Sequence, residues 1–250
     1  MRRGTWITIL AVVAFAAIVI ARLPANWIAP VPPGDVACAS IDGSIWSGTC
    51  GGLTVQGASV GDLTWDVHAL RLLLGKLSVN INLTRPTGSV HGDFDVGLDK
   101  SITARNVQAM LPLDQDLKAL LPANLRSLDG STNANIAFAH ISKGIFTQVE
   151  GVIEIHDLVN HDRDGVTSFG SFSLTFPGGG SGDPTGQLRD LGGPLAIQGT
   201  VRLMQDKPGV DLQGFVTPRA GAAPELVSQL DYLGLPDAQG RRQFGTEMTF

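Results

Sequence analysis

The chain has 250 residues, of which 31 are glycine, and only 16% of its residues are charged. Average proteins have about 7% glycine and about 25% charged residues, so this composition excludes a disordered chain, a helical bundle and a coiled coil. The glycines follow no three-residue repeat, which excludes collagen, and what remains is a loop-rich globular chain, most simply an all-β protein of one or two domains.

The N-terminal segment is predicted to cross a membrane as a helix. An uncharged run extends from Trp6 to Ala21, with Arg2 and Arg3 before it and Arg22 after it. Its length is at the short end for a helix that spans about 30 Å of hydrocarbon. The apolar residues expected to hold this helix in the membrane are Trp6, Ile7, Ile9, Leu10, Val12, Val13, Phe15, Ile18, Val19 and Ile20.

The basic residues before this run predict the topology, because cytoplasmic flanks carry the excess of Lys and Arg. We expect a cytoplasmic tail at residues 1–4, a transmembrane helix at residues 5–22 and a β-rich domain at residues 23–250 across the membrane. The alternative is a signal peptide cleaved near Ala21. The run is long for such a signal, and the aromatic Trp27 soon after it is typical of a membrane exit, so the anchor is favoured.

The charge is divided unevenly between these parts. Three of the 18 basic residues and none of the 23 acidic residues lie in residues 1–22, so the rest of the chain is strongly acidic. A nucleic-acid-binding protein needs a basic face, so nucleic acid is excluded as a partner. The acidic part as a whole is also not attracted to an anionic membrane surface.

The two cysteines, Cys38 and Cys50, are close in sequence. Beyond the membrane the compartment is oxidising, so this spacing predicts one disulfide. Two buried free thiols are the alternative. A metal site is disfavoured because no Cys or His lies at the spacing that metal ligands require.

Apolar residues alternate with polar ones along most of the exported part. This period of two predicts about ten antiparallel strands, each with one apolar and one polar face. The alternating sets are Leu63, Trp65 and Val67; Leu77, Val79, Ile81 and Leu83; Phe94, Val96 and Leu98; Ile136 and Phe138; Val149, Ile153 and Ile155; Phe172, Leu174 and Phe176; Leu195, Ile197, Val201 and Leu203; and Val210, Leu212 and Val216.

Three segments depart from this alternation. Leucines at helical spacing between Pro112 and Leu125, and again between Pro224 and Leu235, predict two short amphipathic helices that cap the sheet. Residues 177–194 are rich in Gly, Ser, Asp and Pro and are predicted to form a long loop.

Glycines inside the alternating runs indicate a bent sheet. Gly151, Gly199 and Gly214 lie at such positions, where glycine weakens a flat strand and allows it to bend sharply. We therefore expect a strongly curved antiparallel sheet, either a half-pipe or an incomplete barrel. The two helices are too short to cover it, so its inner face is expected to form an apolar trough.

No residue pattern indicates a catalytic, cofactor or metal site. Gly57 to Gly61 match the G-x-S-x-G motif around Ser59, but that motif works at a strand-to-helix turn, and this one lies between strand-like runs, which favours a turn or bulge. His156, His161, Asp162 and Asp164 form the densest polar cluster and are interpreted as a solvated hairpin turn.

The last residues suggest one further class of protein. Phe244, Met248 and Phe250 alternate up to a terminal aromatic, as in outer-membrane barrels. Such barrels carry aromatic girdles, whereas only 6% of these residues are aromatic, and the predicted helices interrupt the strands. This class is therefore disfavoured.

Several short motifs occur in order along the whole chain. They are Leu23-Pro24-Ala25 with Trp27, Gly43 with Trp46 and Gly48, Gly61 with Leu63 and Trp65, Leu73 to Gly75, Leu111-Pro112 to Leu121-Pro122, Gly193-Pro194-Leu195, and Leu233-Gly234 with Pro236-Asp237, Gly240-Arg241-Arg242 and Phe244. Each is weak alone, but their order and span resemble the protein N family of the bacterial type II secretion system. At His68-Ala69 the chain departs from the proline expected in that family.

The resemblance implies a single-pass protein of the bacterial inner membrane, with its N-terminus in the cytoplasm and an AsmA-like curved sheet in the periplasm. It implies a non-enzymatic accessory or structural component that helps to export folded proteins across the outer membrane. The implied partners are other secretion proteins, of the assembly platform or the secretin. The alternative is a periplasmic module that binds or handles lipid, which the expected apolar trough favours.

Overall fold

The computed structural model describes residues 12, 15, 18–19, 22–27, 35–120, 125–162 and 165–249. Of the predicted anchor residues, Val12, Phe15, Ile18 and Val19 are among these, all helical and 45–70% exposed. The other predicted anchor residues, which lie outside the described part, are Trp6, Ile7, Ile9, Leu10, Val13 and Ile20. Within the described residues, no helix has the length and apolar character needed to span a bilayer.

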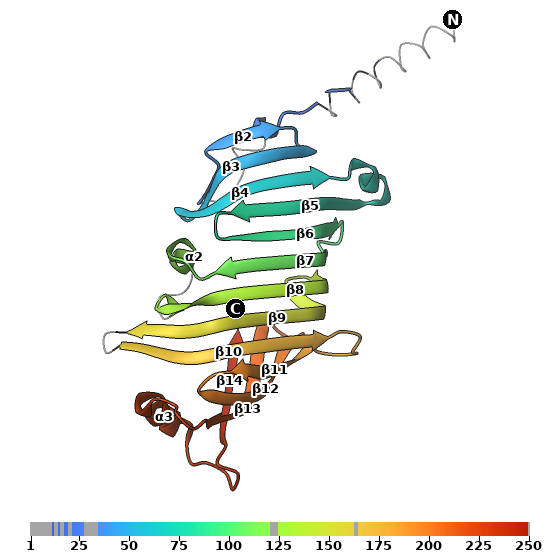
Figure 1. Ribbon diagram of the computed structural model, residues 1–250. Helices are drawn as coiled ribbons and strands as arrows, with labels where there is room; N and C mark the ends of the chain where they lie inside the picture. Colours follow the sequence, from blue (N-terminus) through green and yellow to red (C-terminus); the bar gives the residue numbers. More distant parts are fainter. Residues whose placement is uncertain are drawn as a thin grey trace, which may run out of the picture.

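The described residues form one antiparallel sheet of 14 strands (Figure 1). The strands are β1 (Val36–Ala37), β2 (Ser40–Gly43), β3 (Ser47–Val55), β4 (Ala58–Val67), β5 (Lys76–Arg85), β6 (Gly88–Gly97), β7 (Ile102–Pro112), β8 (Leu128–Ser142), β9 (Ile145–Asp162), β10 (Gly165–Pro177), β11 (Thr185–Gly192), β12 (Leu195–Met204), β13 (Gly209–Pro218) and β14 (Arg242–Thr249). From β3 onward each strand pairs with the next in sequence, whereas β1 and β2 both pair with β3.

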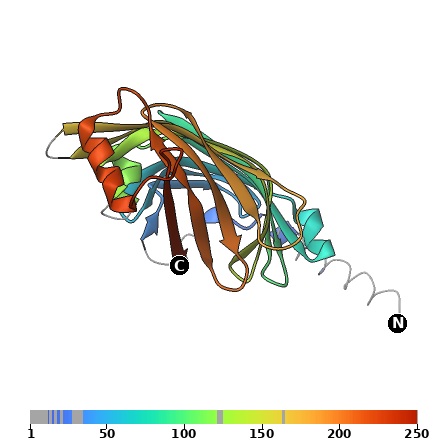
Figure 2. The same ribbon diagram turned by 90° about the horizontal axis from the view of Figure 1, so that it is seen from below.

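The sheet is open and strongly curved, as Figure 2 shows. Among the residues that the structure describes, η1 (Ala25–Trp27) precedes the first strand, and the other short helices lie at the ends of the strands that they connect. These are η2 (Ala69–Leu74), α2 (Gln115–Leu120), α3 (Pro224–Leu230) and η4 (Asp231–Leu233). The mainly β fold class, the curved open sheet and the two predicted amphipathic helices, α2 and α3, are therefore confirmed.

The prediction of a long loop at residues 177–194 was correct for residues 178–184 but wrong for the second half, where residues 185–192 form β11. The period of two is hidden in this strand. At the positions that face the apolar side, β11 carries Gly186 and Asp190 beside Leu188. A Cβ on Gly186 would lie 3.0 Å from the ring of Phe176, so the glycine makes room for that ring. Asp190 is neutralised by Arg219.

Side chains of opposite character cover the two faces of the sheet. Directly opposite residues in an antiparallel pair project from the same face, so a row of cross-strand partners can be followed from strand to strand. One such row, here called the apolar row, runs from β3 to β14 through Cys50, Leu63, Leu83, Val90, Ala109, Ala134, Ile153, Leu174, Leu188, Gly199, Gly214 and Phe244.

The neighbouring row on the other face is mostly polar. It runs through Thr49, Thr64, Asn82, His91, Gln108, Asn135, Val152, Thr175, Gln187, Thr200, Gln213 and Gly245. The alternation predicted for single strands is therefore held in register across the whole sheet.

The buried core lies over the C-terminal half of the sheet. One cluster joins Ala139, Val149 and Phe176 to Val201 and Leu203, so the apolar faces of β8 to β10 pack against that of β12. A second cluster places Leu226 and Leu230 of α3 on Leu195 and Val216. The curvature thus folds this half of the apolar face onto itself, and α3 closes one end (Figure 2).

Two glycines that face each other on neighbouring strands allow the C-terminal half of the sheet to bend. Gly199 and Gly214 are direct partners, and a Cβ on Gly214 would lie 2.4 Å from the carbonyl oxygen of Gln198 and 2.7 Å from Cζ of Phe244. The ring of Phe244 therefore covers the backbone that the two glycines leave bare. An aromatic ring laid across strand glycines is a known device for stabilising bent sheets.

Replacing Gly214 by alanine is expected to lower the free energy of unfolding by about 1–3 kcal/mol, because the new methyl group overpacks against backbone that cannot move aside. Gly245→Ala on β14 is the matched control, since its Cβ would meet no atom closer than 3.7 Å. We expect that variant to stay within about 0.5 kcal/mol of the wild type. Urea unfolding of the full chain measures both, and equal stabilities for the two variants would contradict the packing described.

Helix α2 is fastened to the sheet by a buried ion pair. Arg85 ends β5 with its side chain only 4% exposed, and its Nη2 donates to both carboxylate oxygens of Asp114, at 2.9 and 3.1 Å. The same carboxylate accepts the N–H of Leu117 at 3.1 Å and so caps the N-terminus of the helix. Burial pushes the pKa of Asp114 upward, but the Leu117 N–H and Arg85 outweigh it and hold the pKa below its ordinary value.

The Asp114→Asn variant is expected to be less stable by about 3–5 kcal/mol near neutral pH, because it leaves Arg85 buried without a counter-charge. The control is Asp116→Asn, whose 54% exposed carboxylate lies 3.7 Å from Arg85 and whose loss should change stability by less than about 1 kcal/mol. Because the folded pKa of Asp114 lies below its unfolded value near 4, its stabilisation is complete above that value and disappears as the pH falls through the folded pKa. Denaturant unfolding should therefore show the gap between wild type and Asp114→Asn closing below about pH 4. A gap that does not change with pH would contradict this assignment.

Candidate interaction surface

The residues singled out from the sequence as chemical candidates lie apart from one another. Ser59 is the second residue of β4, opposite Thr54, and the preceding two-residue turn has φ values of 51° at Gln56 and 78° at Gly57. Two positive φ values are typical of a tight hairpin turn, so the predicted turn is confirmed.

Of the polar cluster predicted to form a hairpin turn, His156, His161 and Asp162 lie in strand β9, which pairs with β10. His156 pairs with Glu154 at 3.2 Å, whereas His161 lies 3.6 Å from Asp129 on β8. Asp164 lies outside the described residues. The described part of the chain holds no group of three or more His, Cys, Asp or Glu side chains placed to bind a metal ion.

The most distinctive surface is the apolar face over the N-terminal half of the sheet, here called the open apolar face. Its side chains are Leu63, Trp65, Val67, Val79, Ile81, Leu83, Val90, Phe94, Val96, Val107 and Ala109. All of them are partly exposed, whereas the closed half also contains fully buried side chains, such as Val216 and Phe176 at 3% and 4% exposure. Among the described elements, α2 and η2 approach these strands only at their ends (Figure 2).

Cys38 and Cys50 form the predicted disulfide, with their Cα atoms 5.5 Å apart. Cys50 is 2% exposed and belongs to the apolar row, next to Leu63. The bond fastens the segment between β1 and β2 onto β3. These two outer strands have only two and four residues, so the covalent link replaces the many hydrogen bonds that a longer edge strand would make.

A hollow of about 480 Å³ adjoins this disulfide at the N-terminal end of the open apolar face. The described residues that line it are Ala25, Val36, Ala37, Cys38, Ile41, Ile45, Cys50, Leu53, Leu63 and Trp65. Every one of these residues is apolar. The hollow therefore suits an apolar group and offers no side chain to bind a charge.

The Gly-Trp motif near residue 46 shapes one wall of this hollow. A Cβ on Gly48 would lie 2.5 Å from Cζ2 of Trp65, so the glycine lets the indole lie flat against β3. The indole Nε1 donates to the carbonyl of Ser44 at 3.3 Å. Gly43 has a φ of 97° and faces Gly48 across the hairpin. The motif therefore serves to position Trp65 on the apolar face.

The C-terminal motif fixes the loop that leads into β14. The carboxylate of Asp237 accepts the backbone N–H groups of Arg241 and Gln239 at 2.8 and 2.9 Å, and these donors hold its pKa below the ordinary value. Arg241 places its guanidinium 4.6 Å from the centre of the Phe215 ring. Arg242 pairs with Asp231 at 2.6 Å.

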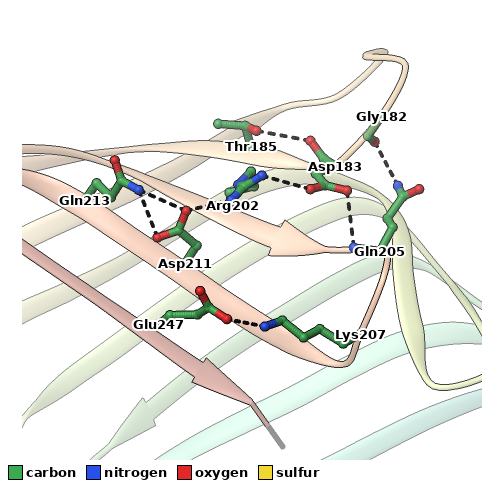
Figure 3. A network of polar contacts seen from close by, with 9 residues as sticks. All are labelled: Gly182, Asp183, Thr185, Arg202, Gln205, Lys207, Asp211, Gln213 and Glu247. Carbon is green, nitrogen blue, oxygen red and sulfur yellow. Dashed lines mark hydrogen bonds and ion pairs between the residues drawn. The ribbon is translucent and has the colours of Figure 1, made fainter.

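The loop between β10 and β11 lies at the other end of the strands from the loop that leads into β14, and polar side chains hold it in place as well. Asp183, in the loop at residues 178–184, accepts hydrogen bonds from Arg202 at 3.4 Å and from the N–H of Gln205 at 3.2 Å (Figure 3). Arg202 also pairs with Asp211 at 2.8 Å and lowers the pKa of that carboxyl. These side chains join β12 and β13 to the loop.

A further cluster attaches η2 to the sheet. Asp95 is buried and accepts hydrogen bonds from the hydroxyl of Ser78 and from Arg71 and Arg105. The Ser78 hydroxyl is the main cause that lowers the pKa of Asp95. Sequence reasoning missed this cluster and the Arg85–Asp114 pair. The signal for the pair was present, because Arg85 falls at the apolar-face position that follows Leu83.

The family model for type II secretion system protein N matches residues 34–245. The chain belongs to the type II secretion system protein N family. It is 27% identical over 240 residues to the type II secretion system protein N of Vibrio cholerae serotype O1, and the match covers 92% of each chain. No solved structure matches the chain.

Family membership confirms the resemblance read from the ordered motifs. Nearly all of those motifs lie inside the matched range, whereas Leu23 to Trp27 precede it. For several of these motifs the described residues give a structural explanation: Gly43 and Gly48 make room for a turn and for Trp65, and Asp237, Arg241 and Arg242 hold the loop before β14.

Replacing valine by the similarly shaped threonine distinguishes the open half of the sheet from the closed half. Val216→Thr is expected to cost about 1–3 kcal/mol of unfolding free energy, because it buries a hydroxyl without a partner. Val90→Thr, in the open apolar face, should cost less than about 0.5 kcal/mol, because its hydroxyl can bind water. Urea unfolding measures both values, and an equal loss at the two positions would mean that the face over β6 is covered.

Proposed function

We propose that this chain is a non-enzymatic, accessory or structural component of the type II secretion machine, which exports folded proteins across the outer membrane. Residues 5–22 anchor it in the inner membrane, with residues 1–4 in the cytoplasm and residues 23–250 in the periplasm. Membership of the protein N family supports its place in this machine. The open apolar face is the observation that supports a binding role.

The open apolar face is the surface through which the chain binds other secretion proteins, of the assembly platform or the secretin. A contiguous, exposed apolar surface on a globular domain is typical of an interaction site. Covering it removes apolar area from water, which is worth about 25 cal/mol for each Å². The face consists of regular strands, so it is rigid before a partner arrives and little ordering entropy is lost on binding.

The use of the polar side chains supports this non-enzymatic role. Arg85, Asp95, Asp190 and Asp237 all form hydrogen bonds near the connections between strands, and each helps to hold a helix or a loop in place. Their charges are compensated by neighbours. They act as fasteners of the scaffold that presents the apolar face.

Lipid binding is the second candidate function, and the hollow beside the disulfide favours it. Its lining is entirely apolar, and Leu63 and Trp65 continue from it into the open apolar face. An acyl chain fits such a surface because it needs no polar partner. Lipid extracted from the purified full chain and identified by mass spectrometry would favour this candidate.

Site-specific photo-crosslinking in a secreting cell tests the proposed function. A photoreactive residue at Leu83 on the open apolar face is compared with one at Asn82, the next residue of β5, which is exposed on the polar face. We expect adducts with secretion proteins from Leu83 and few from Asn82. Each variant must restore export in a strain from which the gene is deleted, which controls for folding.

The outcomes separate the two candidate functions. Adducts at Leu83 that contain only lipid would favour the lipid-handling candidate over the assembly component. Equal adducts at both positions would contradict the open apolar face as the binding surface. Normal export in the deletion strain would contradict a role in secretion altogether.

A further inference from the structure

The two ends of the sheet differ in the chain segments that connect their strands. At one end lie η2, the turn at residues 98–101 between β6 and β7, and the turn at residues 143–144 between β8 and β9. We call this the η2 end. Helices α2 and α3 lie at the opposite end (Figure 2).

The N-terminal segment joins the sheet at the η2 end. The carbonyl of Leu23 accepts the N–H of Ile45 at 3.0 Å, and Pro24 forms a bridge with Ser44. The next residue, Trp46, accepts the N–H of Val67 at 2.5 Å. Val67 is the last residue of β4, directly before the turn into η2. The chain that follows the proposed anchor is therefore held beside η2.

Large apolar side chains project into solvent at this same end. Leu70 of η2 is 81% exposed, and Leu98 in the turn after β6 is 88% exposed. The two connections touch, because a Cβ on Gly75 would lie 3.1 Å from Cδ1 of Leu98. The rim of the open apolar face is exposed here as well, with Leu77 at 39% and Ile102 at 38%.

Lysines gather at the η2 end. Of the five lysines in the sequence, four lie in its connections or at the strand ends beside them: Lys76, Lys100, Lys143 and Lys207. The first three are exposed and form no ion pair within the described residues, whereas Lys207 pairs with Glu247. The fifth, Lys118, lies on α2 at the opposite end and pairs with Asp129.

Acidic side chains also lie at this end. Asp99, beside Lys100, accepts hydrogen bonds from the hydroxyl and the N–H of Ser101 and keeps its negative charge, and Arg71 is paired with Asp95. Asp206 adjoins Lys207. At the opposite end, Arg219, Arg241 and Arg242 are each matched to an aspartate. The exported part is acidic as a whole, yet free ammonium groups are concentrated at the end that carries the exposed leucines.

We propose that the η2 end rests on the surface of the membrane that holds the N-terminal anchor, with Leu70 and Leu98 entering the boundary between headgroups and acyl chains. Exposed leucines flanked by lysines are typical of interfacial membrane contacts, because the lysine stems lie along apolar surface while their ammonium groups bind anionic headgroups. This inference rests on the proposed inner-membrane anchor. The strands then rise from the membrane, and the rim of the open apolar face lies at its surface.

Spin labels on the full chain in lipid vesicles test this contact. A nitroxide is attached at Leu98→Cys or Leu70→Cys, and the matched control is Leu235→Cys, a leucine that is 95% exposed at the opposite end. The native cysteines take no label because they are bonded to each other. The vesicles contain phosphatidylethanolamine and phosphatidylglycerol. Collision rates are measured with oxygen, which concentrates in lipid, and with a water-soluble nickel complex.

We expect the ratio of oxygen to nickel collisions to be several-fold higher at positions 70 and 98 than at position 235. Equal collision ratios at the three positions, in a chain that resists alkaline extraction, would overturn the membrane contact and leave the anchor intact. A protein found to cover the η2 end would overturn the contact in the same way. A chain that alkali removes from the vesicles would contradict the anchor. The ratios recorded before that wash still decide the contact by themselves.

Discussion

The whole structure depends on the constraint that side chains alternate between faces and that the strands stay in register. In an antiparallel sheet a slip of one residue would move every side chain of a strand to the wrong face. Here the apolar row crosses from Cys50 on β3 to Phe244 on β14 without a polar residue. Where a strand carries an extra residue, as at Asn106 with a φ of 50°, a local bulge absorbs it and the alternation resumes.

The same apolar face has two different environments along the sheet. In the C-terminal half, glycines at positions 199 and 214 allow a sharp bend, so the face closes on itself and α3 packs against it. In the N-terminal half, the apolar row carries larger side chains such as Leu63 and Leu83. This half stays open, and it is stabilised at its edge by a disulfide instead of a packed core.

Charged side chains complete the scaffold at the ends of the strands. Arg85 and Asp190 occupy positions that otherwise face the apolar side, and each is neutralised by a partner in a connecting segment. Such pairs are costly to break once they are buried, so they fix the connections in one place. The loops therefore hold the curved sheet in shape without covering its open half.

Much of this fold follows from the sequence, because alternation is a local property. The strands around Ile81, Leu174 and Val201 and the two short helices were predicted from spacing alone, and the disulfide from compartment and proximity. Strand β11 was missed because Gly186 and Asp190 stand at its apolar-face positions. Gly186 makes room for the ring of Phe176, and Asp190 pairs with Arg219, and both partners lie outside this strand.

The sequence also could not predict how far the sheet closes on itself, because that again depends on contacts between distant residues. Leu83 and Leu174 belong to one row and look alike as residues, yet Leu83 lies on the open face and Leu174 packs against the buried core. The difference arises from curvature accumulated over many strands and from contacts between β12 and β9, which no local pattern records. The candidate surface could be predicted as an apolar face, but not which half of it remains open.

Photochemical footprinting with a carbene reagent that labels exposed side chains tests the central claim most directly. The central claim is that one continuous apolar face is open over β4 to β7 and closed over β8 to β13. Labelling of the folded full chain, followed by peptide mass spectrometry, should modify Leu63, Ile81 and Val90 strongly and leave Phe176 and Val216 protected. Equal protection of both sets would contradict the account.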